Sequence, residues 1–235
     1  MIGIGTFLVR KGHASFLKSA VTNERAIQWL LFCGIAASLL LTIFVTAAVL
    51  LTPGYSPLSE PISQLGAQGR PHAEVMNAGF IIIGLLISGF AYGLYCYLGR
   101  TVLAKVVWLL LAVGSIGTIL LGIFQDEWKT LGVMGTLEGN LHAVFAQVAF
   151  IAFLTCIAIF TRLAHRKPSW YDFTHVSLAV FLTNLVLLSL LVAQVSWAGQ
   201  GALELSFVGL SLVWLVAVSL RSLRLLAHAS LPQSP

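Results

Sequence analysis

The sequence predicts an all-α polytopic membrane protein, folded as a bundle of six transmembrane helices. Of its 235 residues, 58% are hydrophobic and only 9% are charged, and the mean hydropathy is +0.95. These values lie outside the range of soluble domains. Six apolar segments also recur along the chain. Each is long enough to cross a hydrocarbon core about 30 Å thick as a helix that rises about 1.5 Å per residue.

The first three segments cover residues 26–51, 73–98 and 102–124. The first is longer than the core of a removable signal peptide, which is about 7–15 residues, so we expect it to remain as a helix. The second opens with Glu74 and Asn77, which are three residues apart and therefore face the same direction on a helix.

The third segment carries Gly114, Thr118 and Gly122 at intervals of four, and Asp126 continues the series. Residues four apart share one face of a helix. Small side chains on such a face let two helices approach closely. We therefore expect this face to pack against a neighbouring helix, with Asp126 at its end.

The last three segments cover residues 141–161, 174–195 and 205–226. Gln147 and Asn184 are the polar residues of interest within them. Interhelical hydrogen bonds of about 1 kcal/mol account for such residues in a buried position, and a substrate pathway is the alternative.

The basic residues orient the bundle, because Lys and Arg are retained on the cytoplasmic side during insertion. With the N-terminus inside, all 13 Lys and Arg except Arg70 and Lys129 fall on the cytoplasmic side. Most acidic residues fall on the other side. Because the basic residues are spread over short juxtamembrane segments, the pI near 9.4 reflects topology and does not favour binding to nucleic acid.

This orientation divides the chain into three parts. Residues 1–25 form a cytoplasmic N-terminal segment, residues 26–227 form the transmembrane domain, and residues 228–235 form a short cytoplasmic tail. Both termini are thus expected in the cytoplasm, with the protein in the cell (cytoplasmic) membrane.

A polar, turn-rich passage at residues 55–80 separates the first two apolar segments. Its Gly and Pro residues break helices, and its Ser, Gln and Asn side chains can satisfy freed backbone groups. Polar residues so close to the bilayer are expected to order a loop or to line a site. Two interpretations stay open, a lid over a site and a turn that plugs the outer end of the bundle. The candidate substrate-binding residues are Ser59, Ser63, Gln64, Arg70 and Asn77.

The carboxylates near the third and fourth segments make a second candidate group. Glu138 and His142 are four residues apart, so they share a helix face. The short loop before them makes contact between His142 and Asp126 or Glu127 plausible. An imidazole beside a carboxylate can act as a general base or bind a divalent metal. The alternative is an interfacial hydrogen-bonding role. The candidate catalytic residues are His142, Asp126, Glu127, Glu138 and Glu60.

The sequence names no cofactor. A divalent metal would be short of ligands, since only His72 adds to the candidate donors. Haem is not expected, because no histidine pair is spaced to clamp it between two helices. The sequence has no HExxH, paired CxxC, GxSxG or phosphate-binding glycine loop.

Two passages identify a family resemblance. Residues 56–67 read SPLSEPISQLGA and residues 76–80 read MNAGF, and together they resemble the uncharacterised prokaryotic membrane family known as domain of unknown function 998. The likeness extends over nearly the whole chain. The family pattern ends the third helix with Phe-Pro-any-Asp, whereas this chain has Phe124-Gln125-Asp126-Glu127, which puts Glu127 at the position of the family's Asp. The resemblance implies six transmembrane helices and no assigned activity.

Three classes of function fit these observations. An enzyme would act on a lipid or membrane-associated substrate through a polar site on the extracytoplasmic face. A small-molecule transporter would need polar groups continuing through the bilayer. An accessory or structural protein would use its small-residue faces to bind another membrane protein or a second copy of itself. The lipid bilayer is the one partner common to all three.

Overall fold

In the computed structural model, the described residues are 4–99, 101–127, 135–194 and 199–229, with 4–22 described as backbone alone. Lys129 and the end of the tail, residues 230–235, lie outside them. The described residues form helices, turns and loops with no strand. Six long helices are connected as the sequence predicts, and two short 3₁₀ helices lie between them. Their bounds are α1 (Ile4–Leu51), η1 (Ile62–Gly66), α2 (Ala73–Leu98), α3 (Val102–Ile123), α4 (Leu137–Arg166), η3 (Pro168–Trp170), α5 (Phe173–Val192) and α6 (Gln200–Ala229).

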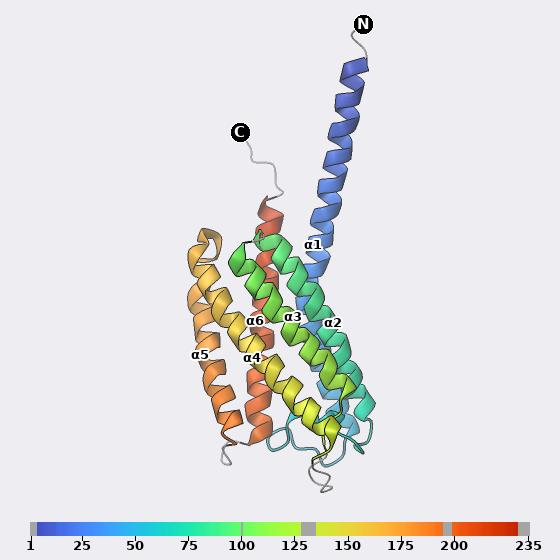
Figure 1. Cartoon of the computed structure of the whole chain (residues 1–235), viewed down its shortest axis with the longest axis vertical. Coiled ribbons are helices and arrows are strands. Elements are labelled where there is room, and N and C mark those ends of the chain that lie inside the picture. The colour runs from blue at the N-terminus through green and yellow to red at the C-terminus, as the bar shows by residue number, and fades with distance from the viewer. Residues whose placement is uncertain (1–3, 100, 128–134, 195–198, 230–235) are drawn as a thin grey trace.

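All six long helices contain a stretch long and apolar enough to cross a membrane, so the multi-pass architecture predicted from the sequence is confirmed. Helices adjacent in the chain pack side by side, and contacts between α1 and α6 close the bundle. Helix α1 begins at Ile4, so the described part of residues 1–25 continues the helix of the first span and projects beyond the bundle (Figure 1).

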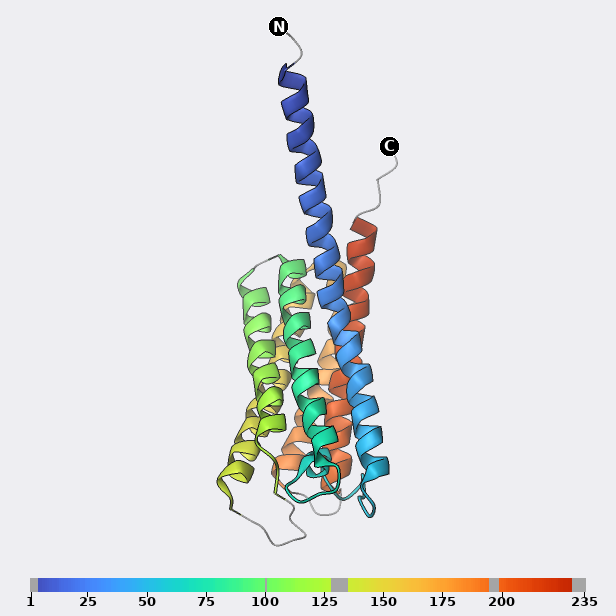
Figure 2. The same ribbon diagram turned by 90° about the vertical axis from the view of Figure 1, so that its right-hand side faces the viewer.

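The start of α1 and the end of α6 lie at the same end of the bundle, which we call the proximal end. The opposite end, which we call the distal end, is formed by residues 52–72, 124–127, 135–137 and 199–204 (Figure 2). The longest connection, residues 52–72, therefore covers the distal end together with the chain that follows α3.

Helix boundaries at both ends have local causes. Thr101 starts α3 by accepting a hydrogen bond from the backbone N–H of Ala104 at 3.2 Å. Thr136 does the same for α4 with Gly139 at 3.1 Å. Such caps satisfy N–H groups that have no partner in the first turn of a helix. The cap at Thr136 also explains why α4 begins four residues before the apolar run at 141.

The small-residue stripe of α3 differs from our expectation. The helix ends at Ile123 and Phe124 is extended, so Asp126 is not on a helical face. Gly114 lies against Phe153 of α4, whereas Gly122 lies against α2. Because α3 lies between α2 and α4, its small residues pack against both of these helices.

The two polar residues of the fourth and fifth helices also differ from one another. Asn184 is fully buried and donates a hydrogen bond to Ser211 of α6 at 3.0 Å, as an interhelical role predicts. Gln147 is exposed on α4 and so is not the buried group that the sequence suggested.

Candidate functional site

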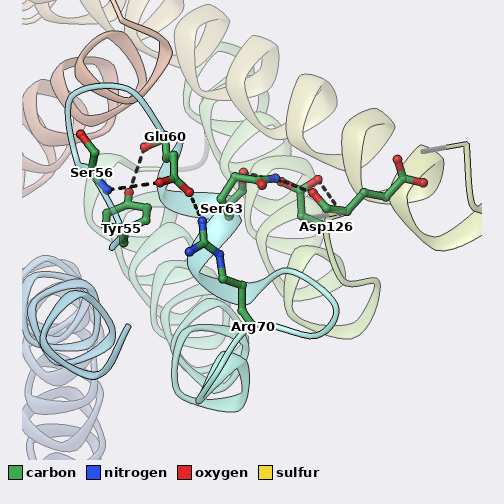
Figure 3. A network of polar contacts seen from close by, with 8 residues as sticks. Tyr55, Ser56, Glu60, Ser63, Arg70 and Asp126 are labelled. Atoms are coloured by element: carbon green, nitrogen blue, oxygen red, sulfur yellow. Dashed lines mark hydrogen bonds and ion pairs between the residues drawn. The ribbon is translucent and has the colours of Figure 1, made fainter. Parts of the chain in front are cut away.

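The loop between α1 and α2 lies at the distal end, and its central part, η1, is largely buried. Four of the five residues of η1 are buried, and Leu65 and the following Ala67 are fully so. The loop therefore covers the distal end of the bundle, and its Ser63 side chain points toward Asp126 in the chain that follows α3 (Figure 3).

Asp126 anchors this loop to the end of α3. Its Oδ2 accepts hydrogen bonds from Ser63 Oγ at 2.8 Å and from Gln64 Nε2 at 2.7 Å. Its backbone carbonyl accepts from the N–H of Gln68 at 2.9 Å. Hydrogen bonds to a charged acceptor are about twice as strong as neutral ones. Three residues predicted as site candidates are thus brought together in one docking contact (Figure 3).

Glu127 binds a different segment, the start of α4. Its Oε1 accepts hydrogen bonds from the backbone and the hydroxyl of Thr136, the residue that caps α4. Its side chain also packs so closely on Gly139 that a Cβ at that position would collide with it. Both acidic residues at the end of α3 are therefore used, Asp126 to hold the loop and Glu127 to hold the start of α4.

Arg70 and Glu60 form an ion pair inside the loop. Arg70 is buried, and its guanidinium lies 5.9 Å from the ring centroid of Tyr55. The hydroxyl of Tyr55 donates to the carbonyl of Glu60 at 3.0 Å. Burial, and secondarily the carboxylate of Glu204, raise the pKa of Tyr55 above its ordinary value of 10. This tyrosine is thus a neutral donor that closes the loop on itself (Figure 3).

The remaining predicted residues lie at the edges of this network. Asn77 is buried in α2 and donates to the carbonyl of Gly66 at 3.1 Å. Glu138 is exposed and accepts from Gln68 Nε2 at 2.8 Å. Ser59 is exposed on the loop surface. Asn77 therefore connects α2 to η1 by a hydrogen bond, while Glu138 and Ser59 are exposed to the surface.

His142 lies apart from the carboxylates and faces a cavity. Its Nδ1 is 2.7 Å from the carbonyl oxygen of Phe124. A carbonyl can only accept, so in the neutral ring Nδ1 carries the proton and Nε2 carries the lone pair. Only 3% of the residue is exposed, and Nε2 has no hydrogen-bond partner among the described residues. The expected contact of His142 with Asp126 or Glu127 is replaced by this backbone contact two residues earlier.

The cavity has a volume of about 90 Å³ and lies beneath η1. Aliphatic and aromatic side chains from α1, α2, α3, α4 and α6 make up most of its lining. Five polar side chains also line it, namely Ser63, Thr118, His142, Glu204 and Ser211. It is thus an apolar chamber with a few fixed polar groups, the usual composition of a small-molecule site.

Glu204 is the residue that the sequence did not single out. It is 7% exposed on α6, and its Oε2 accepts from the N–H of Ile62 at 2.7 Å, so it ties η1 to α6. The available signal was a single carboxylate immediately before the last apolar segment, because a carboxylate so close to the membrane is costly and often functional.

No metal centre forms among these residues. Across the described part of the chain, no three His, Cys, Asp or Glu side chains are grouped so that they could hold a metal ion. Glu138 accepts a hydrogen bond from the amide of Gln68, Asp126 accepts one from the amide of Gln64, and Glu127 accepts one from the hydroxyl of Thr136. The polar groups that line the cavity are the imidazole of His142, the carboxylate of Glu204 and three hydroxyls.

A family model described as "Protein of unknown function (DUF998)" matches residues 35–221. The chain belongs to this family. The match covers most of the bundle and includes η1, His142 and Glu204, so the DUF998 domain contains the whole cavity. No characterised protein and no solved structure shows significant similarity to the chain.

Proposed function

We propose that this protein binds and acts on a lipid or another membrane-dissolved molecule in the distal cavity, with His142 as the general base. The observation that carries the proposal is the lone pair of Nε2, buried in an apolar chamber and without a partner among the described residues. Leaving a buried polar atom without a partner costs about 1–3 kcal/mol, so such an atom calls for a ligand or a chemical role.

The distribution of basic residues supports an extracytoplasmic position for this cavity. Among the described residues, every Lys and Arg except Arg70 lies at the proximal end of the bundle or on the part of α1 that projects beyond it. The positive-inside rule then puts the proximal end in the cytoplasm. The substrate would be taken from the outer leaflet of the cell membrane.

The polar groups deeper in the bundle support a site rather than a transport path. Ser88 pairs with Ser115, and Asn184 pairs with Ser211, each across two helices. Thr161 and Trp214 both donate to Ser177. These groups bond to one another, and Asn184 Oδ1 is the single buried acceptor among them without a partner in the described residues, so they offer little to a polar solute that crosses the membrane.

The test compares His142→Gln with His175→Gln, which changes an exposed histidine at the proximal end. The wild type and both variants are placed in vesicles made from the total lipid of the producing cells, and lipid classes are followed over time by mass spectrometry. We expect one class to change with the wild type and with His175→Gln. A general base contributes about 10²–10⁴-fold, so the change should be lost in His142→Gln.

Two results would contradict the proposal. One is a lipid composition that stays the same as in protein-free vesicles. The other is a His142→Gln variant as active as the wild type. Size-exclusion elution of all three proteins shows whether any loss comes from unfolding.

A further inference from the structure

The polar side chains around the cavity share a property that restricts its ligand: they present acceptors. Ser63 donates its hydroxyl proton to Asp126, Thr118 donates to the carbonyl of Gly114, and Ser211 donates to the carbonyl of Phe207. The Nδ1 proton of His142 is held by Phe124. The carboxylate of Glu204 has only acceptor oxygens. These five side chains therefore offer a ligand hydrogen-bond acceptors and no donors.

An acceptor-lined chamber discriminates between head groups. A hydroxyl or an ammonium can donate to His142 Nε2 and complete its hydrogen bonding. A phosphate or a carboxylate cannot, and it would also face the charge of Glu204 and, behind Ser63, that of Asp126. Sites built to hydrogen-bond one partner reject molecules that lack it, because the buried groups are then left unpaired.

The size of the cavity restricts the ligand further. About 90 Å³ is room for a small polar group but not for a hydrocarbon chain. A groove of about 360 Å³ lies next to it on the distal half of the bundle, between α1 and α6. Four residues line both spaces and form a single layer of side chains between them. These residues are Leu41, Ile62, Val208 and Leu212.

Most of the groove lining belongs to the stretches of α1 and α6 that are long and apolar enough to span a membrane, so a bilayer would surround it with hydrocarbon. Its lining is mainly apolar, with Val45 and Val49 on one side and Leu205 on the other. The groove has empty space beside Gly209, because a Cβ at this position would meet no heavy atom within 4 Å among the described residues. A lipid chain is the occupant that matches this depth and chemistry.

We infer that the ligand is a long-chain lipid with a hydrogen-bond donor as its head group, a hydroxyl or an amine. The head group donates to His142 Nε2 in the cavity, and the chain lies in the α1/α6 groove over Gly209. Side-chain rotation of Val208 and Leu212 joins the two spaces. This inference rests on the proposed function and adds to it the class of ligand and the path by which it enters.

The test uses a long-chain alcohol that carries a photoreactive diazirine in its chain, with the protein in phosphatidylcholine nanodiscs. We expect labelled peptides from residues 42–50 of α1 and 205–212 of α6. The matching methyl ether, which cannot donate, and the matching carboxylate should label these peptides about tenfold less, a difference that corresponds to about 1.4 kcal/mol. The matching amine distinguishes the two donors, because Glu204→Gln should weaken the amine more than the alcohol.

Two variants separate the chain from the head group. A Cβ at Gly209 would meet no heavy atom within 4 Å among the described residues, and leucine has a higher helix propensity than glycine. Gly209→Leu should therefore place a side chain in the groove and abolish labelling while the protein stays folded. Val213→Phe, at an exposed position of the same helix outside the groove and cavity, is the matched control and should label like the wild type.

Equal labelling by alcohol and ether would overturn the donor requirement. Undiminished labelling of Gly209→Leu would overturn the groove. Either result leaves the proposed function standing as long as lipid turnover depends on His142, and loss of that dependence would remove the proposed function as well.

Discussion

The two ends of the bundle are built in opposite ways. At the proximal end, Trp170 is fully buried and its ring makes edge-on contacts with Phe160 and Phe173 at centroid distances of 5.1 and 5.6 Å. Phe160 also meets Trp214 at 5.2 Å. At the distal end, the corresponding space is a chamber that contains a buried imidazole and a buried carboxylate.

The polar groups follow the same division. At the proximal surface, Arg221 pairs with Asp172 and donates to the carbonyl of Ser169. At the distal end, the buried carboxylate of Glu204 accepts from the backbone of η1, and Asp126 accepts from the side chains of Ser63 and Gln64. The aromatic cluster stabilises the bundle by packing alone. The cavity is less tightly packed, and its polar groups are accessible to a ligand. The comparison therefore locates the proposed site at the distal end, and it shows that the buried aromatic packing lies at the proximal end.

The largest expected effect is on stability at the proximal end. Trp170→Ala removes a fully buried ring and should cost about 3–5 kcal/mol in the free energy of unfolding. Phe150→Ala, which enlarges a cavity that already exists, should cost less. Denaturant unfolding in mild detergent measures both. A larger loss from Phe150→Ala would mean that the chamber is as tightly packed as the aromatic cluster.

An intermediate effect is expected where the distal loop docks. Asp126→Ala removes the acceptor of two side-chain hydrogen bonds, and bonds to charged groups contribute about 1.5–3 kcal/mol each. Limited proteolysis should then cut within residues 52–72. Glu74→Gln, at a surface position near the loop, is the control and should change stability by no more than about 0.5 kcal/mol. A loop equally resistant in both variants would show that Asp126 is not its anchor.

The smallest effect is a pH dependence at the proximal surface. The hydrogen bond from Arg221 lowers the pKa of Asp172 below its ordinary value of 3.8. A carboxylate whose pKa is lower in the folded than in the unfolded state contributes stability at pH values above the unfolded-state pKa. This contribution is lost as the pH falls through the folded-state pKa. The melting temperature of the wild type should therefore slightly exceed that of Asp172→Asn at neutral pH. The two should converge in strong acid, and a difference that persists there would contradict this account.

The helices could be predicted from the sequence because their signal is local. Length and hydropathy fix each span, and both bounds of α2 agree with the predicted segment. Spacing also singled out His142. Its partner could not be predicted, because a backbone carbonyl has no side-chain signature and Phe124 was read as the end of a helix. Glu204 was missed for a related reason, since its acceptor role depends on the N–H of Ile62, 142 residues away.

The common position of the α1 start and the α6 end has a practical consequence. A fluorescent protein or an affinity tag attached beyond the start of α1 or the end of α6 would lie at the opposite end of the bundle from η1 and the loop that covers the cavity (Figure 1). Sidedness reporters and surface tethers can therefore be added at both termini of the same molecule, while the distal face stays open to reagents added from the other side.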